Sequence, residues 1–214
     1  MKLISPPYLQ IALDLIDKDE LKRILSEIPS VNKILIEAGT PLIKKFGISI
    51  LKEILQIHPD SYIIADMKTL DVGRLEVQIA AEEKTKAVTI SALSSNETIE
   101  SSLEEAKKRN VDIILDLMNV DDPLELLKQL SRVPEIVLFH RGIDQEGQFE
   151  HSWEKIKMVK QYSHDLLVAV AGGLNLQTSL QALKNGADII VIGRAITAAA
   201  NIDIAVQDFL DLLK

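Results

Sequence analysis

The segment Tyr62-Ile63-Ile64-Ala65-Asp66-Met67-Lys68-Thr69-Leu70-Asp71 combines a short apolar run with three charged side chains. Consecutive apolar residues bounded by polar ones are typical of a buried strand, and a helical pattern begins at Asp71. Because side chains alternate along a strand, Asp66 and Lys68 are expected to project to the same face. Charged groups at the mouth of a buried strand are costly unless they pair, bind a metal or do chemistry. The segment therefore predicts either a functional site or a salt-bridge cluster.

The same strand-then-helix unit recurs along the whole chain. Besides 62–68, strands are predicted at 8–15, 31–38, 87–90, 111–117, 135–140, 166–171 and 189–192. Helices are predicted at 17–28, 41–58, 71–83, 97–109, 123–130, 153–162, 176–185 and 202–213. Apolar strands that alternate with helices indicate a parallel sheet. Eight of them favour a closed (β/α)8 TIM barrel over an open flavodoxin-like sheet, which usually has about five or six strands. With no linker in the sequence, we expect one domain over 1–214.

Composition narrows the classes of function. The net charge of −8 argues against nucleic acid or an anionic membrane as the main partner. The chain has no cysteine, which excludes disulfides and thiolate metal sites. No apolar run reaches the roughly 18 residues of a membrane-spanning helix, and the N-terminus lacks a signal-peptide pattern. We therefore expect a cytoplasmic protein that binds a small molecule.

Ionisable residues gather at the predicted strand ends, where the active site of a (β/α)8 barrel lies. One such residue could be structural, but several at equivalent positions predict convergence on a single site. These residues are Asp14, Glu37, Asp66, Lys68, Asp116 and His140.

Glu37 and Asp66 follow neighbouring strands, and two close carboxylates need a proton, a lysine or a cation between them. Oxygen ligands without cysteine favour Mg²⁺, with Mn²⁺ as the alternative. The competing interpretation is a salt-bridge network that only braces the barrel mouth. Lys68, expected between Asp66 and Asp71, should be charged and suited to donate a proton or clamp an anion. His140 is the candidate proton shuttle.

The other three histidines, His58, His151 and His164, are predicted to lie at the surface.

Glycine-containing loops follow the seventh and eighth strands, the usual phosphate site of these barrels. Gly172 and Gly173 allow close approach of backbone N–H groups, as does Gly193, and Arg194 adds a bidentate donor. Together they predict a sugar phosphate or nucleotide monophosphate ligand.

At these residues the sequence resembles the orotidine 5′-monophosphate decarboxylase suprafamily, and within it the 3-hexulose-6-phosphate synthases. The resemblance covers nearly the whole chain. It rests on Ala12-Leu13-Asp14, Glu37-Ala38-Gly39-Thr40-Pro41-Leu42, Asp66-Met67-Lys68-Thr69-Leu70-Asp71, Asp116-Leu117, His140, Ala169-Val170-Ala171-Gly172-Gly173 and Gly193-Arg194-Ala195-Ile196-Thr197. The Asp-x-Lys-x-x-Asp element is common to the suprafamily, whereas Glu37 stands where metal-independent orotidine decarboxylases carry lysine.

The resemblance implies a Mg²⁺-dependent aldehyde-lyase with the metal on Glu37 and Asp66. The expected reaction is the reversible aldol condensation of ribulose 5-phosphate with formaldehyde through a 1,2-enediolate. Lys68 and His140 would handle charge and protons. Asp71 would orient Lys68 and reach the partner's site in a homodimer.

The predicted substrate contacts are Asp14, Asp116 and Arg141. The sequence departs from the synthase pattern at residues 82–86 and 91–94 and at Arg141, where synthases usually have threonine. Two alternatives therefore stay open. One is a decarboxylase of 3-keto-L-gulonate 6-phosphate or, less favoured, of orotidine 5′-monophosphate. The other is a catalytically silent barrel that binds a sugar phosphate.

Overall fold

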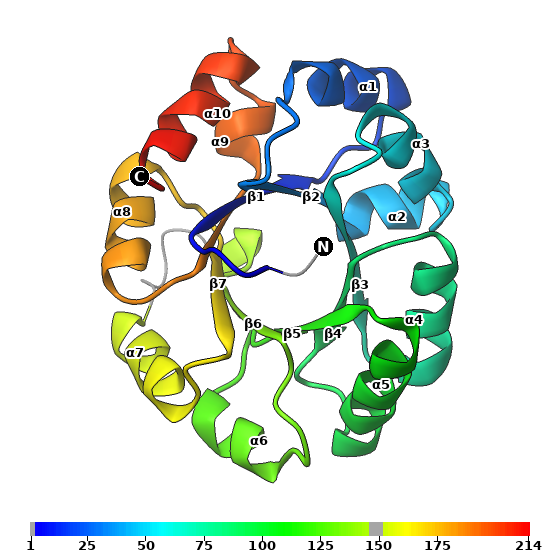
Figure 1. The fold of residues 1–214 in the computed structure, drawn as a ribbon, viewed down its shortest axis with the longest axis vertical. Coiled ribbons are helices and arrows are strands. Elements are labelled where there is room, and N and C mark those ends of the chain that lie inside the picture. The colour runs from blue at the N-terminus through cyan, green and yellow to red at the C-terminus, as the bar shows by residue number, and fades with distance from the viewer. Residues whose placement is uncertain (1–2, 146–151) are drawn as a thin grey trace.

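The computed structural model describes residues 3–145 and 152–214. In them, eight parallel strands pair in sequence order, and β8 pairs with β1 to close a barrel (Figure 1). The strands are β1 (Tyr8–Leu13), β2 (Ile34–Ala38), β3 (Tyr62–Thr69), β4 (Ala87–Ser91), β5 (Asp112–Asp116), β6 (Ile136–His140), β7 (Leu167–Ala171) and β8 (Ile189–Ile192). The predicted (β/α)8 barrel is confirmed, and the open sheet is excluded.

Helices surround the barrel on all sides (Figure 1). They are α1 (Lys18–Glu27), α2 (Thr40–Phe46), α3 (Ile50–Ile57), α4 (Gly73–Glu82), α5 (Asn96–Arg109), α6 (Pro123–Gln129), α7 (Trp153–Tyr162), α8 (Leu176–Lys184), α9 (Arg194–Thr197) and α10 (Ile202–Asp211), with the 3-10 turn η1 (Ile143–Gln145). In the part of the chain described, no helix has the length and apolar character needed to cross a membrane.

Two helix predictions were wrong. The single helix expected over 41–58 is two helices, because Gly47 has a φ of 77° and ends α2. Gly47 takes this left-handed region without the strain that a Cβ atom would cause. The residues after β8 were expected to form a loop, but Arg194 begins the short helix α9.

Apolar side chains fill both faces of the strands. The outward-facing ones pack against the helices in one large cluster. The inward-facing ones form a second cluster inside the barrel, which includes Tyr8, Leu35, Tyr62, Ile114 and Ile189. Beyond this second cluster, towards the C-terminal ends of the strands, buried residues are polar. Gln10, Glu37, Asp66 and Asp116 are each at most 8% exposed. These buried polar residues therefore rest on the apolar core inside the barrel.

β3 contains an irregularity that simple alternation does not predict. Ala65 pairs with Val88 and Thr69 with Ile90, so four residues of β3 advance against two of β4. Lys68 lies inside this bulge with a φ of 46°. Such bulges re-aim side chains at the rims of barrels. The bulge, rather than a regular strand, sets the direction of Lys68.

One histidine prediction was also wrong. His58 is buried at the C-terminal end of α3, with Nε2 2.8 Å from the Leu25 carbonyl oxygen and Nδ1 3.1 Å from Ser30 Oγ. These contacts tie the end of α3 to α1 and to the segment that follows α1. His164 is exposed as predicted, and His151 lies outside the described residues.

Candidate active site

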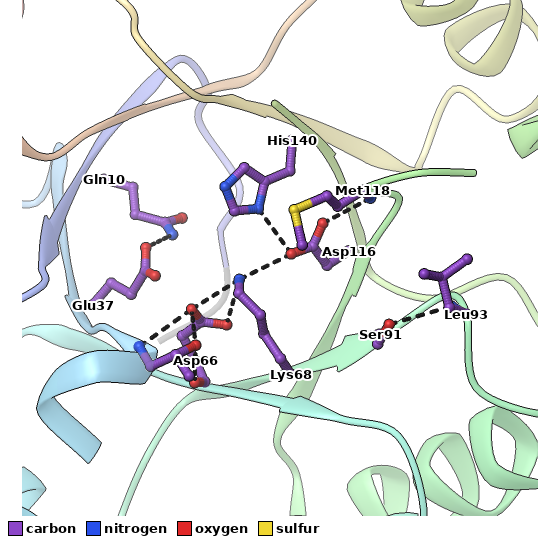
Figure 2. Close-up of polar contacts among 10 residues, drawn as sticks. Gln10, Glu37, Asp66, Lys68, Ser91, Leu93, Asp116, Met118 and His140 are labelled. Carbon is purple, nitrogen blue, oxygen red and sulfur yellow. Dashed lines mark hydrogen bonds and ion pairs between the residues drawn. The ribbon is translucent and has the colours of Figure 1, made fainter. Parts of the chain in front are cut away.

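The structure brings six predicted side chains to one end of the barrel. Asp14, Glu37, Asp66, Lys68, Asp116 and His140 come from the ends of β1, β2, β3, β5 and β6. Figure 2 shows five of them turned towards the barrel interior, with Glu37 on one side and His140 and Asp116 on the other. Their proximity agrees with the sequence-based expectation, while their catalytic roles stay predictions.

Lys68 lies between two buried carboxylates. Its Nζ is 3.0 Å from Asp66 Oδ2 and 3.0 Å from Asp116 Oδ2 (Figure 2). Burial opposes the charged form, but the two carboxylates outweigh it and raise the pKa of Lys68 above its usual value. Lys68 is therefore a fixed cation, suited to stabilise negative charge.

Asp71 was predicted to be the second carboxylate beside Lys68, and within this chain that prediction was wrong. Asp71 is exposed, and its Oδ1 accepts a hydrogen bond from the backbone N–H of Val72 at 2.7 Å. Asp116 takes the expected place beside Lys68. The prediction that Asp71 reaches a partner's site is a separate matter, because it concerns a second copy of the chain.

Asp116 also holds His140. Its Oδ2 is 2.9 Å from His140 Nδ1, and its Oδ1 accepts from the backbone N–H of Met118 at 3.0 Å. Burial would raise the pKa of Asp116, but the His140 hydrogen bond and the Lys68 charge together hold it below the usual value. Because an ionised carboxylate only accepts, His140 Nδ1 donates this hydrogen bond, and in a neutral imidazole the basic nitrogen is then Nε2.

Glu37 occupies a different environment. It is buried, and its Oε2 accepts a hydrogen bond from Gln10 Nε2 at 2.6 Å. Burial first, and then the Asp66 and Asp14 carboxylates, raise the pKa of Glu37 to about 8. A carboxyl group in this state takes up either a proton or a cation at neutral pH.

The donor set fits a small divalent cation. Glu37 and Asp66 offer carboxylate oxygens, and Gln10 Oε1 is a buried amide oxygen with no hydrogen-bond partner among the described residues. Within residues 3–145 and 152–214, no cluster of three or more His, Cys, Asp or Glu side chains is arranged around a common point. Mg²⁺ does not need such a cage, because it is usually held by one or two carboxylates together with waters and substrate oxygens.

Asp66 is fixed from a second direction by Thr40, the first residue of α2. Thr40 Oγ1 is 2.6 Å from Asp66 Oδ2 and 3.0 Å from the Asp66 carbonyl oxygen. The turn that follows Glu37 on β2 therefore orients the carboxylate of the next strand.

Asp14 lies at the rim against two glycines. A Cβ atom on Gly39 would come within 2.0 Å of Asp14 Oδ1, and one on Gly193 within 3.9 Å of Oδ2. The side chain is exposed, yet the surrounding protein and then Asp66 raise its pKa. Asp14 therefore lies at the barrel rim, against the turns that contain Gly39 and Gly193.

The predicted phosphate loops lie side by side because β7 pairs with β8. Gly172 and Gly173 both have positive φ angles, 103° and 61°. A Cβ atom on Gly172 would be 2.1 Å from the Arg141 carbonyl oxygen. Arg141 Nη2 donates to the Gly172 carbonyl oxygen at 3.0 Å, so this side chain braces the loop. Arg194 opens α9 beside Gly193 with an exposed side chain.

Gln10 and Thr40 contact the site but were not predicted from the sequence. Gln10 is a polar residue in the middle of an apolar strand, at even spacing from Ala12 and Asp14, and that anomaly was the available signal. Thr40 belongs to the connection after Glu37, but nothing in its spacing indicated a bond to Asp66.

The comparisons with known proteins agree with the geometry of the site. Residues 7–209 match the Orotidine 5′-phosphate decarboxylase / HUMPS family. A relative from Methanothrix thermoacetophila named "Bifunctional enzyme Fae/Hps" is 47% identical over 214 residues, which is 100% of this chain and 54% of the relative. This chain therefore spans about half the length of that relative.

Two solved structures of 3-hexulose-6-phosphate synthase superpose closely. One has a TM-score of 0.85 and 28% identity, covering 97% of this chain and 100% of the other. The second, from Salmonella typhimurium, has a TM-score of 0.88 and 26% identity, covering 96% and 97%.

Proposed function

The chain belongs to the Orotidine 5′-phosphate decarboxylase / HUMPS family, and we propose that it is a carbon–carbon lyase of the 3-hexulose-6-phosphate synthase type. The proposed reaction is the reversible condensation of ribulose 5-phosphate with formaldehyde. We expect it to act in the cytoplasm on a free sugar phosphate.

The observation that carries this proposal is that Glu37 lies near Asp66, and that Asp66 contacts Lys68 of the Lys68–Asp116–His140 network. One half of the site offers oxygen ligands, and Glu37 has a pKa raised to about 8. The other half offers a fixed cation and a histidine base. Aldol chemistry needs both an electrophile for the sugar oxygens and a base for a carbon-bound proton.

Glu37 and Asp66 would hold Mg²⁺, with Mn²⁺ as the alternative. When bound, the ion supplies Lewis-acid polarisation of the sugar carbonyl. Gln10 and Thr40 keep the two carboxylates in place.

His140 Nε2 would take the proton from C1 of ribulose 5-phosphate. C1 then forms a bond to the carbonyl carbon of formaldehyde, and a proton passes from His140 to the formaldehyde oxygen to give the hydroxymethyl group. Lys68 stays protonated and stabilises the negative charge that develops on the sugar oxygens. In cleavage the same groups act in reverse order.

The substrate phosphate would bind at the β7 and β8 loops. Gly172, Gly173 and Gly193 allow backbone N–H groups to approach the anion, and Arg194 adds positive charge. Asp14 would bind a sugar hydroxyl at the rim, and Arg141 would keep the β7 loop in shape.

We also propose a homodimer that forms through the β3–α4 connection. Leu70, Val72 and Leu75 are 60%, 54% and 51% exposed there, and Leu93 after β4 is 55% exposed. A hollow of about 530 Å³ lies in the same region, lined by residues that include Asp71, Leu75, Gln78, Thr98 and Ser101. Clustered exposed apolar side chains beside a hollow are typical of interaction sites. Asp71 would then reach the partner's site.

A substrate panel tests the reaction. Purified protein with Mg²⁺ is expected to form hexulose 6-phosphate from formaldehyde and ribulose 5-phosphate, and not to release carbon dioxide from 3-keto-L-gulonate 6-phosphate or orotidine 5′-monophosphate. Glu37→Gln should abolish turnover, whereas Glu104→Gln, on an exposed side chain of α5, should not. Carbon dioxide release without condensation would overturn the proposal.

A further inference from the structure

Gln10 is a buried amide in the interior of the barrel. It lies in the middle of β1 and is 1% exposed. Its Nε2 donates to Glu37 Oε2 at 2.6 Å, while its Oε1 has no hydrogen-bond partner among the described residues. Buried polar atoms in folded proteins almost always have partners, so an amide with one satisfied end points to a ligand or water on the other.

The barrel register explains why these two side chains meet. Ala12 pairs with Glu37, and Gln10 pairs with Leu35, so Gln10 is the diagonal neighbour of Glu37 on the inner face. Ala12 is small and leaves room for the amide to reach upward. Figure 2 shows the amide of Gln10 and the carboxylate of Glu37 side by side, on the side of the barrel interior across from His140 and Asp116.

We propose that Gln10 is a positioning residue that tunes which cation Glu37 binds. Its N–H group holds Oε2, which leaves Oε1 of Glu37 as the single oxygen for the ion. Its own unpartnered oxygen accepts a hydrogen bond from a water of the ion's hydration shell. The inference rests on the proposed cation site at Glu37 and Asp66.

This arrangement favours small octahedral ions. Mg²⁺ and Mn²⁺ keep several waters and accept one oxygen per carboxylate, whereas Ca²⁺ takes six to eight oxygens and often binds both oxygens of a carboxylate. Thr40 restrains Asp66 Oδ2 in the same way as Gln10 restrains Glu37 Oε2. Each carboxylate therefore has one oxygen held by an uncharged side chain of the protein, while Asp66 Oδ1 also accepts from Lys68 Nζ at 3.2 Å.

The test measures cation binding rather than turnover. Dissociation constants for Mn²⁺, Mg²⁺ and Ca²⁺ are determined by electron paramagnetic resonance and calorimetry for wild type, Gln10→Met and Gln207→Met. Gln10→Met keeps the side-chain volume but removes both ends of the amide. Gln207→Met is the matched control, since Gln207 Nε2 donates to Asp211 Oδ1 at 2.8 Å on the exposed face of α10.

We expect Gln10→Met to weaken Mn²⁺ and Mg²⁺ binding by about 10- to 100-fold, the usual effect of losing a group that orients a metal ligand. Ca²⁺ binding should weaken less, so that the preference for Mg²⁺ over Ca²⁺ falls. Gln207→Met should match wild type. If Gln10→Met does not fold, Gln10→Asn, which retracts the amide by one carbon, should show the same direction of change.

The outcomes separate this inference from the proposed function. Wild-type protein that binds no divalent cation would reject the metal site itself, and this inference with it. Wild-type binding together with unchanged constants and unchanged selectivity in folded Gln10→Met would reject the role of Gln10 alone.

Discussion

Asp116 contacts both the proposed fixed cation, Lys68, and the proposed base, His140. Its Oδ2 contacts Lys68 Nζ at 3.0 Å and His140 Nδ1 at 2.9 Å. The sequence placed Asp116 at a strand end but did not show these contacts. Lys68 reaches it from the bulge of β3 across the neighbouring strand β4. Spacing along the chain pointed instead to Asp71.

Asp116→Asn should therefore impair catalysis more than stability. The amide cannot hold the His140 tautomer with Nε2 as base, and kcat should fall by about 100- to 10,000-fold. The control is Asp112→Asn at the opposite end of β5, where Oδ2 accepts from Tyr62 Oη at 2.5 Å. Steady-state kinetics and thermal denaturation compare the two. A similar loss of kcat in both variants would contradict the role of Asp116.

Glu37 should give the metal-free protein a pH-dependent stability. Burial, and then Asp66 and Asp14, raise the pKa of Glu37 from 4.5 to about 8. The folded chain keeps a proton that the unfolded chain loses above about pH 4.5, so the free energy of unfolding falls as the pH rises to about 8. Chemical denaturation in EDTA across this range measures the effect. In Glu37→Gln the free energy of unfolding should fall less over the same pH range. An equal fall in this variant would show that other groups cause the pH dependence.

At the scale of elements, the order and type of strands and helices could be predicted because apolar runs and helical patterns are local signals. The break at Gly47 was missed because a glycine inside a helical pattern is often tolerated. The β3 bulge was missed because it depends on pairing with β4, which no local pattern shows. The buried position of His58 depends likewise on contacts with distant residues.

The β7 loop provides an element-scale prediction. Gly172→Ala would place a Cβ atom 2.1 Å from the Arg141 carbonyl oxygen at a φ of 103°, so the loop must shift. We expect the KM for the sugar phosphate to rise at least about 10-fold and stability to fall by about 1–3 kcal/mol. Gly186→Ala is the matched control, since its φ is 100° but its Cβ would meet only the Lys160 side chain at 3.7 Å. It should lose stability without a change in KM; an increased KM there too would contradict the role of the β7 loop.

At the scale of the whole molecule, substitutions on different sides of the barrel should affect dimerisation differently. Leu75 on α4 belongs to the proposed dimer surface, and Ile204 on α10 lies on another side of the barrel (Figure 1). Their exposures are similar, 51% and 55%. Leu75→Glu should produce a monomer in analytical ultracentrifugation with reduced turnover, because Asp71 no longer reaches a partner. Ile204→Glu should stay dimeric. A wild-type monomer with full activity would contradict the dimer.

The central claim is that Glu37 and Asp66 make condensation of formaldehyde with ribulose 5-phosphate depend on a divalent cation. The most direct measurement is the initial rate of hexulose 6-phosphate formation before EDTA treatment, after it, and after Mg²⁺ is restored. We predict that EDTA reduces the rate to background, that Mg²⁺ restores it in wild type, and that Mg²⁺ restores nothing in Glu37→Gln. A rate unchanged by EDTA would contradict the claim.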